Sequence, residues 1–217
     1  MKRARQLCCA LTFSLLTYPV MAAGDYDPMT LFQMLMTADT VVSGEITRVE
    51  AATYDLEVQQ SFVPAKTPAV LSVRRIDEAP MASRWTGYAS GQEIVLFAKS
   101  GDGDNAPLTP LGAAGEGEVP RDGQAVYLPN LAPTDRTPGS AEVAGGIVTG
   151  YRVGADEFSA AMEGFFHCFS RVPGKAPAKG PKLERLCDNA ELASFRAQSW
   201  LAEHLVGISE RVIAGNN

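Results

Sequence analysis

The sequence contains little histidine, the side chain that enzymes use most often for general acid–base catalysis. Its 217 residues include only two histidines, His167 and His204. The patterns His-Glu-x-x-His, Cys-x-x-Cys and Gly-x-Ser-x-Gly do not occur, so the usual signatures of zinc hydrolases, thiol oxidoreductases and serine hydrolases are missing. His167 and Cys168 are neighbours on a predicted helix, where side chains diverge by about 100° and do not face each other as a catalytic pair. We therefore expect a protein with no metal and no other cofactor.

Positive charge is also scarce in this chain. It has 19 basic and 25 acidic residues, which gives a formal net charge of −6. Nucleic acids and anionic membranes bind proteins that offer them a basic face. The acidic balance therefore argues against a nucleic acid or an anionic membrane surface as the partner.

Long hydrophobic runs are missing except near the amino terminus. Residues 1–23 begin with three basic residues, continue with an apolar stretch over 7–16 and end in the small residues Ala22 and Ala23. This order predicts a secretory signal peptide, whereas a membrane anchor would need a longer stretch without interruption by Thr, Ser and Pro. Cleavage would change the net charge from −6 to −9, because three positive charges and no acid would be lost. We expect a periplasmic or secreted protein with no membrane span after cleavage.

Cysteine is equally sparse, with four residues in the chain. Cys8 and Cys9 lie in the predicted signal peptide and would leave with it. Cys168 and Cys187 would remain, and an exported chain meets oxidising conditions. The sequence therefore predicts one disulfide, between Cys168 and Cys187.

The chain is rich, by contrast, in residues that favour strands. Val41, Val42, Ile46 and Val49 are β-branched and closely spaced, and Gly44 between them indicates a bulge or bend. In the next stretch apolar side chains alternate with polar ones, which is typical of a strand with one buried face. The apolar members of this alternation are Tyr54, Leu56, Val58 and Phe62.

The region 24–128 predicts a short helix followed by a small OB-like Greek-key β-barrel. The helix is expected to begin with Asp27 as its cap and Pro28 at its first position. Beyond the two strands described above, further strands are expected over 70–76, 91–98 and 108–111, and in a hairpin formed by 116–119 and 124–128. The region 129–153 is expected to form a loop rich in Pro and Gly, followed by an edge strand over 147–153.

The region 154–217 changes to a helical period and is expected to form an appendage of two helices. The first has Gly154 as a possible cap and carries an aromatic stripe. A basic loop over 172–182 follows, and Asp188 with Glu191 then predicts a capping box for the second helix, with a kink beyond Ser199. The members of the stripe on the first helix are Phe158, Ala161, Met162, Phe165, Phe166 and Phe169.

Two groups of residues are candidates for chemistry. Arginines near a tryptophan could form a patch that binds cations and aromatic groups or, alternatively, could be ordinary solvated charges; these residues are Arg74, Arg75, Arg84 and Trp85. The acidic pairs Glu116 with Glu118 and Asp102 with Asp104 are spaced so that both members project from one face of a strand. A glycosidase uses such a pair, which is the basis of an alternative interpretation as an extracytoplasmic hydrolase acting near Glu116.

The predicted barrel also resembles a known class of modules. The stretch Ala-Asp-Thr-Val-Val-Ser-Gly-Glu-Ile over 38–46 and the stretch Gly-Gln-Glu-Ile-Val-Leu-Phe over 91–97 resemble netrin-like modules and tissue inhibitors of metalloproteinases, and uncharacterised exported bacterial proteins similar to them. In those inhibitors an amino-terminal cysteine binds the zinc of the protease. The mature chain here would begin near Ala23 or Gly24, so this activity does not carry over.

The residues and the resemblance together predict a mainly β protein with a C-terminal pair of helices. We expect an exported, non-catalytic binding or interaction protein whose partner is a protein or another component of the cell envelope. The resemblance implies that an inhibitor-like role is one form of this function. The hydrolase remains the alternative at this point.

Overall fold

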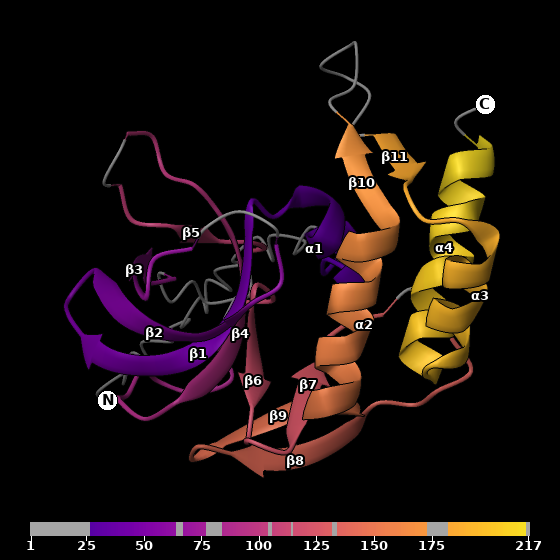
Figure 1. Cartoon of the computed structure of the whole chain (residues 1–217). Helices are drawn as coiled ribbons and strands as arrows, with labels where there is room; N and C mark the ends of the chain where they lie inside the picture. Colours follow the sequence, from indigo (N-terminus) through magenta and orange to yellow (C-terminus); the bar gives the residue numbers. More distant parts are fainter. Residues whose placement is uncertain are drawn as a thin grey trace, which may run out of the picture.

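The computed structural model describes residues 27–63, 67–76, 84–103, 106–113, 115–131, 134–172 and 182–215. The expected signal peptide over 1–23 lies outside these residues. Within them the chain is mainly β, with a nine-stranded antiparallel sheet, a separate two-stranded sheet and four helices. Figure 1 shows the strongly curled strands β1 to β3 on one side of the molecule and helices α2 to α4 on the other. The prediction of a mainly β protein with C-terminal helices is confirmed.

The first helix, α1 (Leu31–Thr37), begins later than the sequence predicted. Thr30 is its cap, because the Thr30 side chain accepts a hydrogen bond from the Gln33 N–H and the Gln33 side chain accepts one from the Thr30 N–H. This capping box satisfies two backbone donors at once, an advantage that Asp27 and Pro28 do not offer. The expected start at Asp27 and Pro28 is therefore wrong.

Strands β1 (Thr40–Val49) and β2 (Thr53–Ser61) lie where the sequence predicted two strands, and they pair antiparallel. Their register shifts between Ser43 and Gly44, so the bulge expected at Gly44 is confirmed. The strand with the longest buried run is β4 (Glu93–Lys99), which pairs with β1 along its whole apolar stretch. These pairings make β1 and β4 the centre of the curled part of the sheet.

The remaining strands extend this sheet on both sides. Its order is β3-β2-β1-β4-β6-β7-β9-β8, with β5 paired to β4. All of these pairings are antiparallel. The strands not yet given are β3 (Val70–Arg74), β5 (Thr109–Pro110), β6 (Glu118–Arg121), β7 (Ala125–Leu128), β8 (Gly139–Val143) and β9 (Gly146–Gly154).

The strand order is an open path, and the strand pairing of the described residues does not close into a barrel. A single parallel bridge, between Val73 and Leu108, links the end of β3 to the residue before β5. The inner face of the curl nevertheless carries its own apolar core, which includes Leu56, Val73 and Leu96. The curled strands thus enclose apolar side chains on their inner face.

The β8–β9 hairpin differs from the prediction for 129–153. Its strand β8 lies within the segment expected to be a loop, and β9 lies between β7 and β8, so β8 is the edge strand instead of 147–153. Ala144 and Gly145 both have positive φ and connect the strands by a tight turn that suits a hairpin. Few apolar residues mark β8 in the sequence, because most of it is exposed.

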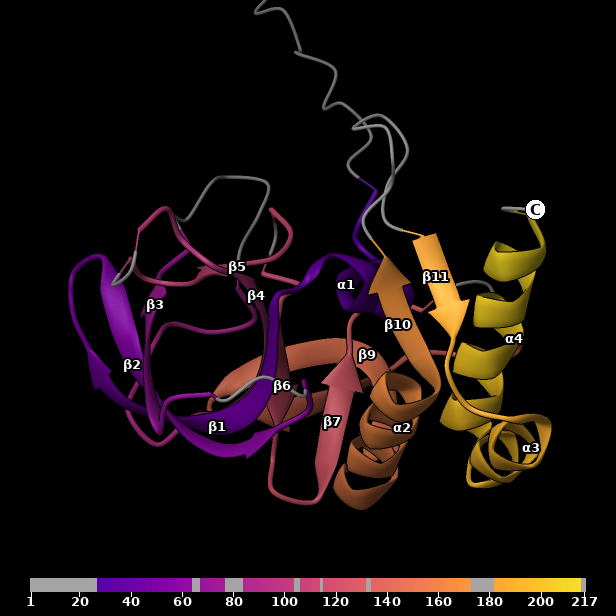
Figure 2. The same cartoon turned by 45° about the horizontal axis from the view of Figure 1, so that its top comes forward.

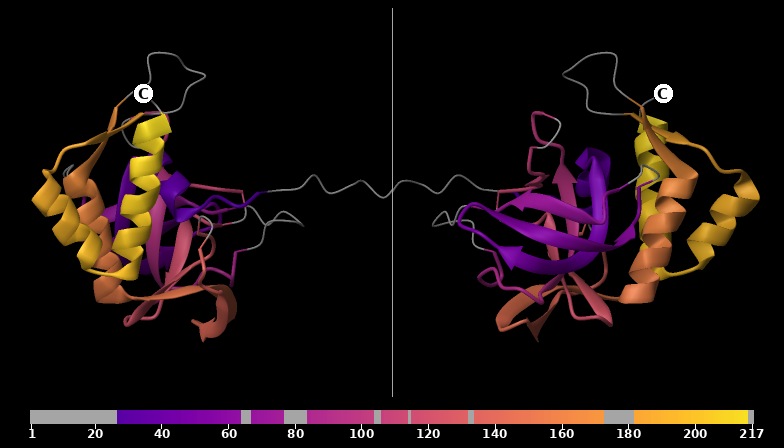
Figure 3. Two further views of the ribbon diagram at one scale, coloured as in Figure 1. Left: turned by 90° about the vertical axis from the view of Figure 1, so that its right-hand side faces the viewer. Right: turned by 60° about the vertical axis from the view of Figure 1, so that its left-hand side comes forward.

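The C-terminal part forms three helices and a hairpin instead of two helices. Helix α2 (Ala155–Cys168) has Gly154 at its cap position, as expected, but Phe169 begins strand β10 (Phe169–Val172). This strand pairs with β11 (Lys182–Arg185), so the expected loop over 172–182 starts and ends in strands, and its residues 173–181 lie outside the described part. Figures 2 and 3 show the helices as a layer beside the sheet, with the hairpin above α2.

The last two helices are α3 (Asn189–Ala197) and α4 (Trp200–Gly215). The capping box of Asp188 and Glu191 is confirmed, since each side chain bonds the backbone N–H of the other. The kink expected beyond Ser199 is a complete break between two helices. No helix in the described part of the chain is both long and apolar enough to cross a membrane.

The disulfide between Cys168 and Cys187 is confirmed, with an S–S distance of 2.17 Å. Cys168 is the last residue of α2, and Cys187 directly precedes the cap of α3. The Leu186 N–H also donates a hydrogen bond of 2.8 Å to the Cys168 carbonyl. The end of α2, the hairpin and the start of α3 are therefore fixed to one another at a single point.

We expect the substitution Cys187→Ser to loosen this C-terminal region before it disturbs the sheet. The disulfide joins residues with a sequence separation of 19. Removing a crosslink that closes a loop of this size costs roughly 3 kcal/mol of stability. Limited proteolysis should then cut first between Arg171 and Arg185, while 40–128 stays protected. Equal protection of both regions in the variant and in the unsubstituted protein would contradict this expectation.

Candidate functional site

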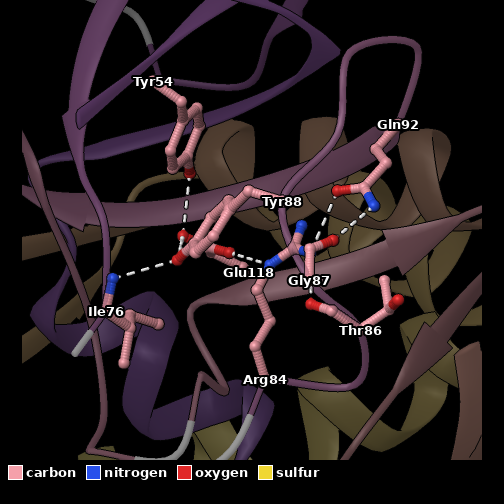
Figure 4. Close-up of polar contacts among 8 residues, drawn as sticks. All are labelled: Tyr54, Ile76, Arg84, Thr86, Gly87, Tyr88, Gln92 and Glu118. Atoms are coloured by element: carbon pink, nitrogen blue, oxygen red, sulfur yellow. Dashed lines mark hydrogen bonds and ion pairs between the residues drawn. The ribbon is translucent and has the colours of Figure 1, made fainter. Parts of the chain in front are cut away.

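The curled part of the sheet encloses a buried ion pair between Arg84 and Glu118. Glu118 opens β6, and its pairing with Leu96 of β4 directs it into the inner core of the curl. The Arg84 Nε donates to the Glu118 Oε2 at 2.5 Å. The exposed fraction of the side chain is 4% for Arg84 and 0% for Glu118. Figure 4 shows this pair at the centre of a group of polar side chains.

Two tyrosines complete the contacts of the Glu118 carboxylate. The hydroxyl of Tyr54, on β2, donates to the Glu118 Oε1 at 2.9 Å, and the hydroxyl of Tyr88 donates to the same oxygen at 3.0 Å. The Tyr88 hydroxyl also accepts a hydrogen bond from the Ile76 N–H at 2.9 Å. Both oxygens of the carboxylate are therefore occupied by protein donors.

The guanidinium of Arg84 also holds the backbone that leads into β4. Its Nη1 donates to the Thr86 carbonyl at 2.9 Å and to the Gln92 Oε1 at 3.0 Å. The Gln92 Nε2 in turn donates to the Gly87 carbonyl at 2.7 Å. These hydrogen bonds fix the backbone of residues 84–92 next to the positively charged Arg84 guanidinium.

Aromatic rings surround the same guanidinium. The Arg84 Cζ lies 4.6 Å from the centroid of the Trp85 ring and 4.3 Å from that of Tyr88, distances that suit cation–π interactions. Trp85 packs against both the inner core of the curl and a second core cluster, which includes Tyr127 and Val148. Gly146, at the start of β9, has no room for a side chain because the backbone of Trp85 lies against it. The segment 84–92 thus joins the curled strands to the β7–β9 end of the sheet.

Burial changes the acidity of these groups. Desolvation raises the pKa of Glu118, and the charge and hydrogen bonds of Arg84 oppose that shift. Desolvation also raises the pKa of Tyr54 and of Tyr88, and the charge of Glu118 adds to both shifts. Both tyrosines therefore stay protonated and remain donors to the carboxylate.

A carboxyl group with a raised pKa is a common feature of acid catalysts, but this one is enclosed. The Glu118 side chain has no exposed surface, and its oxygens already bind Arg84, Tyr54 and Tyr88. A substrate would have to displace these contacts to reach it. The arrangement fits a structural ion pair that fixes the segment 84–92.

The four residues of the expected binding patch occupy different environments. Arg84 is buried, Trp85 is half-buried, and Arg75 reaches the same group by lying 4.8 Å above the Tyr88 ring. The Arg75 Nη1 also donates to the carbonyls of Glu50 and Ala51. Arg74 is exposed on β3 and is not brought into this group. The structure thus gathers three of the four residues around Arg84 and Tyr88, with Arg84 buried and with Arg75 and Trp85 half-buried.

The acidic residues of the hydrolase alternative do not meet at an open cleft. Glu116 is buried like Glu118, and Asp102 is exposed in a turn after β4. Asp104 lies outside the described residues. His167 is exposed and lies 3.4 Å from Glu191, and His204 is half-buried. Within the described ranges no group of three or more His, Cys, Asp or Glu residues could hold a metal ion.

The sequence did not indicate that Tyr54, Tyr88 and Gln92 belong to one site. Tyr54 fits the apolar alternation of its strand, and Tyr88 and Gln92 lie in a segment without regular periodicity. The contact depends on the register of β6 against β4, which places Glu118 opposite Leu96. An arginine followed closely by two aromatic residues, as in Arg84, Trp85 and Tyr88, was the one available sign of a cation–π cluster.

The surface beside strand β10 is hollowed and apolar. The hollow has a volume of about 350 Å³ and lies next to the disulfide. Leu186, at its rim, is 63% exposed. Other hollows among the described residues lie between α2 and α3, between α3 and α4, and between 134–136 and the start of α4. Their linings include several charged groups. The residues that line the hollow beside β10 are Asp39, Val63, Phe165, Phe166, Phe169, Ser170, Arg171 and Leu186.

Comparisons of this chain with protein-family models, with curated proteins and with solved structures find no match. Its function must therefore be argued from its own residues.

We expect the substitution Glu118→Gln to destabilise the protein by about 3–5 kcal/mol, because it leaves the charge of Arg84 buried without a counter-charge. The matched control is Glu93→Gln on the same sheet. Glu93 lies 3.9 Å from Arg121 in a partly exposed pair, for which a loss of at most about 1 kcal/mol is expected. Urea unfolding of the two variants measures the difference, and equal small losses would show that the buried pair does not fix the fold.

Proposed function

We propose that this chain is an exported, non-catalytic binding protein that takes up a protein partner in the hollow beside β10. The observation that carries the proposal is an exposed leucine held rigidly at the rim of a hollow lined by phenylalanines. Leu186 is 63% exposed and lies next to Cys187, whose disulfide fixes it to the end of α2. Apolar groups held in place at a concave surface are typical anchors of protein interfaces.

Export is the part of the proposal that the cysteines and the amino terminus support. Disulfides persist in oxidising compartments and are uncommon in the cytosol, and the described cysteines are paired. The signal-like composition of residues 1–23 is consistent with this compartment. We place the protein in the periplasm or outside the cell.

The lack of catalysis is the part that the buried ion pair supports. Glu118, the one carboxyl group among the described residues with a clearly raised pKa, is enclosed and is occupied on both oxygens. The hydrolase alternative required an acidic pair at an accessible surface near Glu116, and Glu116 is itself buried. A binding role therefore uses the exposed features of the molecule, whereas a hydrolytic role would need its enclosed ones.

We also propose that the curled strands are a variant of the OB-type barrel, as the resemblance to netrin-like modules suggests. The parallel bridge between Val73 and Leu108 supports this, because it brings the end of β3 to the residue before β5 and so narrows the opening of the curl. The apolar core inside the curl supports it as well. An inhibitor-like role towards an envelope protein would be one form of the proposed binding function.

Site-specific photo-crosslinking tests the proposed interface. A photoreactive phenylalanine analogue is placed at Leu186 or, as the matched control, at Ile147, which is 66% exposed at the start of β9. In cells that express the protein, position 186 should give one defined product and position 147 should not. An excess of the unlabelled protein should remove that product, and the variant Leu186→Asp should fail to remove it. The same products from both positions, or no product from position 186, would contradict the proposal.

A further inference from the structure

Strand β10 has one edge that no described strand covers. Among the described strands it pairs with β11 alone, in an antiparallel register. In such a pair the backbone groups of alternate residues point towards the partner strand and away from it. The hydrogen bond from the Leu186 N–H to the Cys168 carbonyl fixes which residues point inward. Cys168 and Ser170 face β11, so the backbone groups of Arg171 face the opposite edge.

This open edge borders the apolar hollow. Phe169, Ser170 and Arg171 of β10 all line it, together with Asp39 and Val63. The Phe169 N–H donates to the Phe165 carbonyl, so the Phe169 carbonyl and both backbone groups of Arg171 remain on the edge of β10 that faces away from β11. The Arg171 side chain reaches the Ala38 carbonyl at the end of α1, which lies beside β10 in Figures 1 and 2. No described strand therefore pairs with this edge of β10, which lies next to an apolar surface.

We infer that this edge binds an extended peptide segment of the partner, which adds as a further strand to β10. The inference rests on the proposed function and specifies how that function is carried out. Unpaired strand edges bind extended chains through backbone hydrogen bonds, while alternate side chains enter neighbouring pockets. Here one apolar side chain of the segment enters the hollow between Phe166 and Leu186.

The charges around the hairpin favour an acidic segment. Lys182 and Arg185 of β11 are exposed, and with Arg171 they outnumber the two acids of the hairpin and the hollow, Glu184 and Asp39, although the chain as a whole carries a net charge of −6. A second copy of this chain is a poorer occupant. Pairing of two β10 strands about a two-fold axis would bring the two basic hairpins together.

The test uses a labelled synthetic peptide, acetyl-Glu-Val-Glu-Leu-Glu-Val-amide, and two variants of the protein. Arg171→Ala removes the side chain and keeps the outward N–H, whereas Arg171→Pro removes the N–H as well and is compatible with an edge strand. We expect fluorescence anisotropy to show binding to Arg171→Ala and at least about tenfold weaker binding to Arg171→Pro, since one backbone donor is lost. Circular dichroism and thiol titration confirm that both variants fold and form the disulfide.

A second measurement needs no variant of the protein. Peptides N-methylated at alternate residues lose the backbone donors of one edge only, so one of the two methylated peptides should bind like the parent and the other should not. The peptide with Lys in place of Glu should bind more weakly than the acidic peptide. Equal binding by both methylated peptides, or no binding at millimolar concentration, would overturn strand addition.

Sedimentation of the protein alone identifies the competing occupant. A dimer whose formation is prevented by Arg171→Pro and retained in Arg171→Ala would show that the edge pairs with a second copy, and would overturn the inference of an acidic segment. The peptide and sedimentation results can fail while the crosslinking from position 186 succeeds. A crosslinked partner with no binding of the acidic peptide would reject strand addition and retain the proposed interface.

Discussion

The arrangement of the sheet depends on the pairing of two buried charges, those of Arg84 and Glu118, since neither can stay buried without the other. A charged pair withdrawn from water is costly unless its remaining donors and acceptors are also bound. Here Tyr54 and Tyr88 bind the carboxylate, and the carbonyl of Thr86 and the side chain of Gln92 accept from the Arg84 Nη1. The Arg84 Nη2 is buried without a hydrogen-bond partner among the described residues. Satisfying these groups requires strands β2 and β6 and the segment 84–92 to meet at one place.

The position of this pair connects the two ends of the sheet. Trp85, next to Arg84, packs in both the core of the curl and the cluster of the β7–β9 end. The helices lie beside the other face of the sheet (Figure 3). Their apolar residues join those of β4 and β7 in the main core. With both faces used for packing, the binding surface that we propose lies on the hairpin beyond α2, where the disulfide supplies the rigidity.

Local signals in the sequence predicted local structure well. Two such features, the bulge at Gly44 and the capping box of Asp188 and Glu191, depend on residues close in sequence. The disulfide was predicted because Cys168 and Cys187 are the two cysteines that would remain after signal cleavage. The start of α1 was wrong because the reciprocal bonds of Thr30 and Gln33 outweigh the preference of Pro28 for a first helical position.

The errors elsewhere arise from contacts between distant segments. Strand β8 is exposed along most of its length, so it lacks the alternation that marks a strand, and it forms because β9 pairs with it. Phe169 continues the helical period of α2, yet the disulfide and the pairing with Arg185 place it in β10. Glu118 and Arg84 are separated by 34 residues, and their contact depends on a strand register that no local pattern encodes.

The account assigns the buried cluster to stability and the edge of β10 to binding, and one variant tests this division directly. Combining Arg84→Met with Glu118→Gln removes both charges and keeps an acceptor for Tyr54 and Tyr88, so the fold should be retained without a buried unpaired charge. With the photoreactive residue at position 186, this double variant should give the same crosslinked product as the unsubstituted protein. A double variant that folds, with its disulfide formed, and has lost that product would place the buried cluster in the binding function and contradict the account.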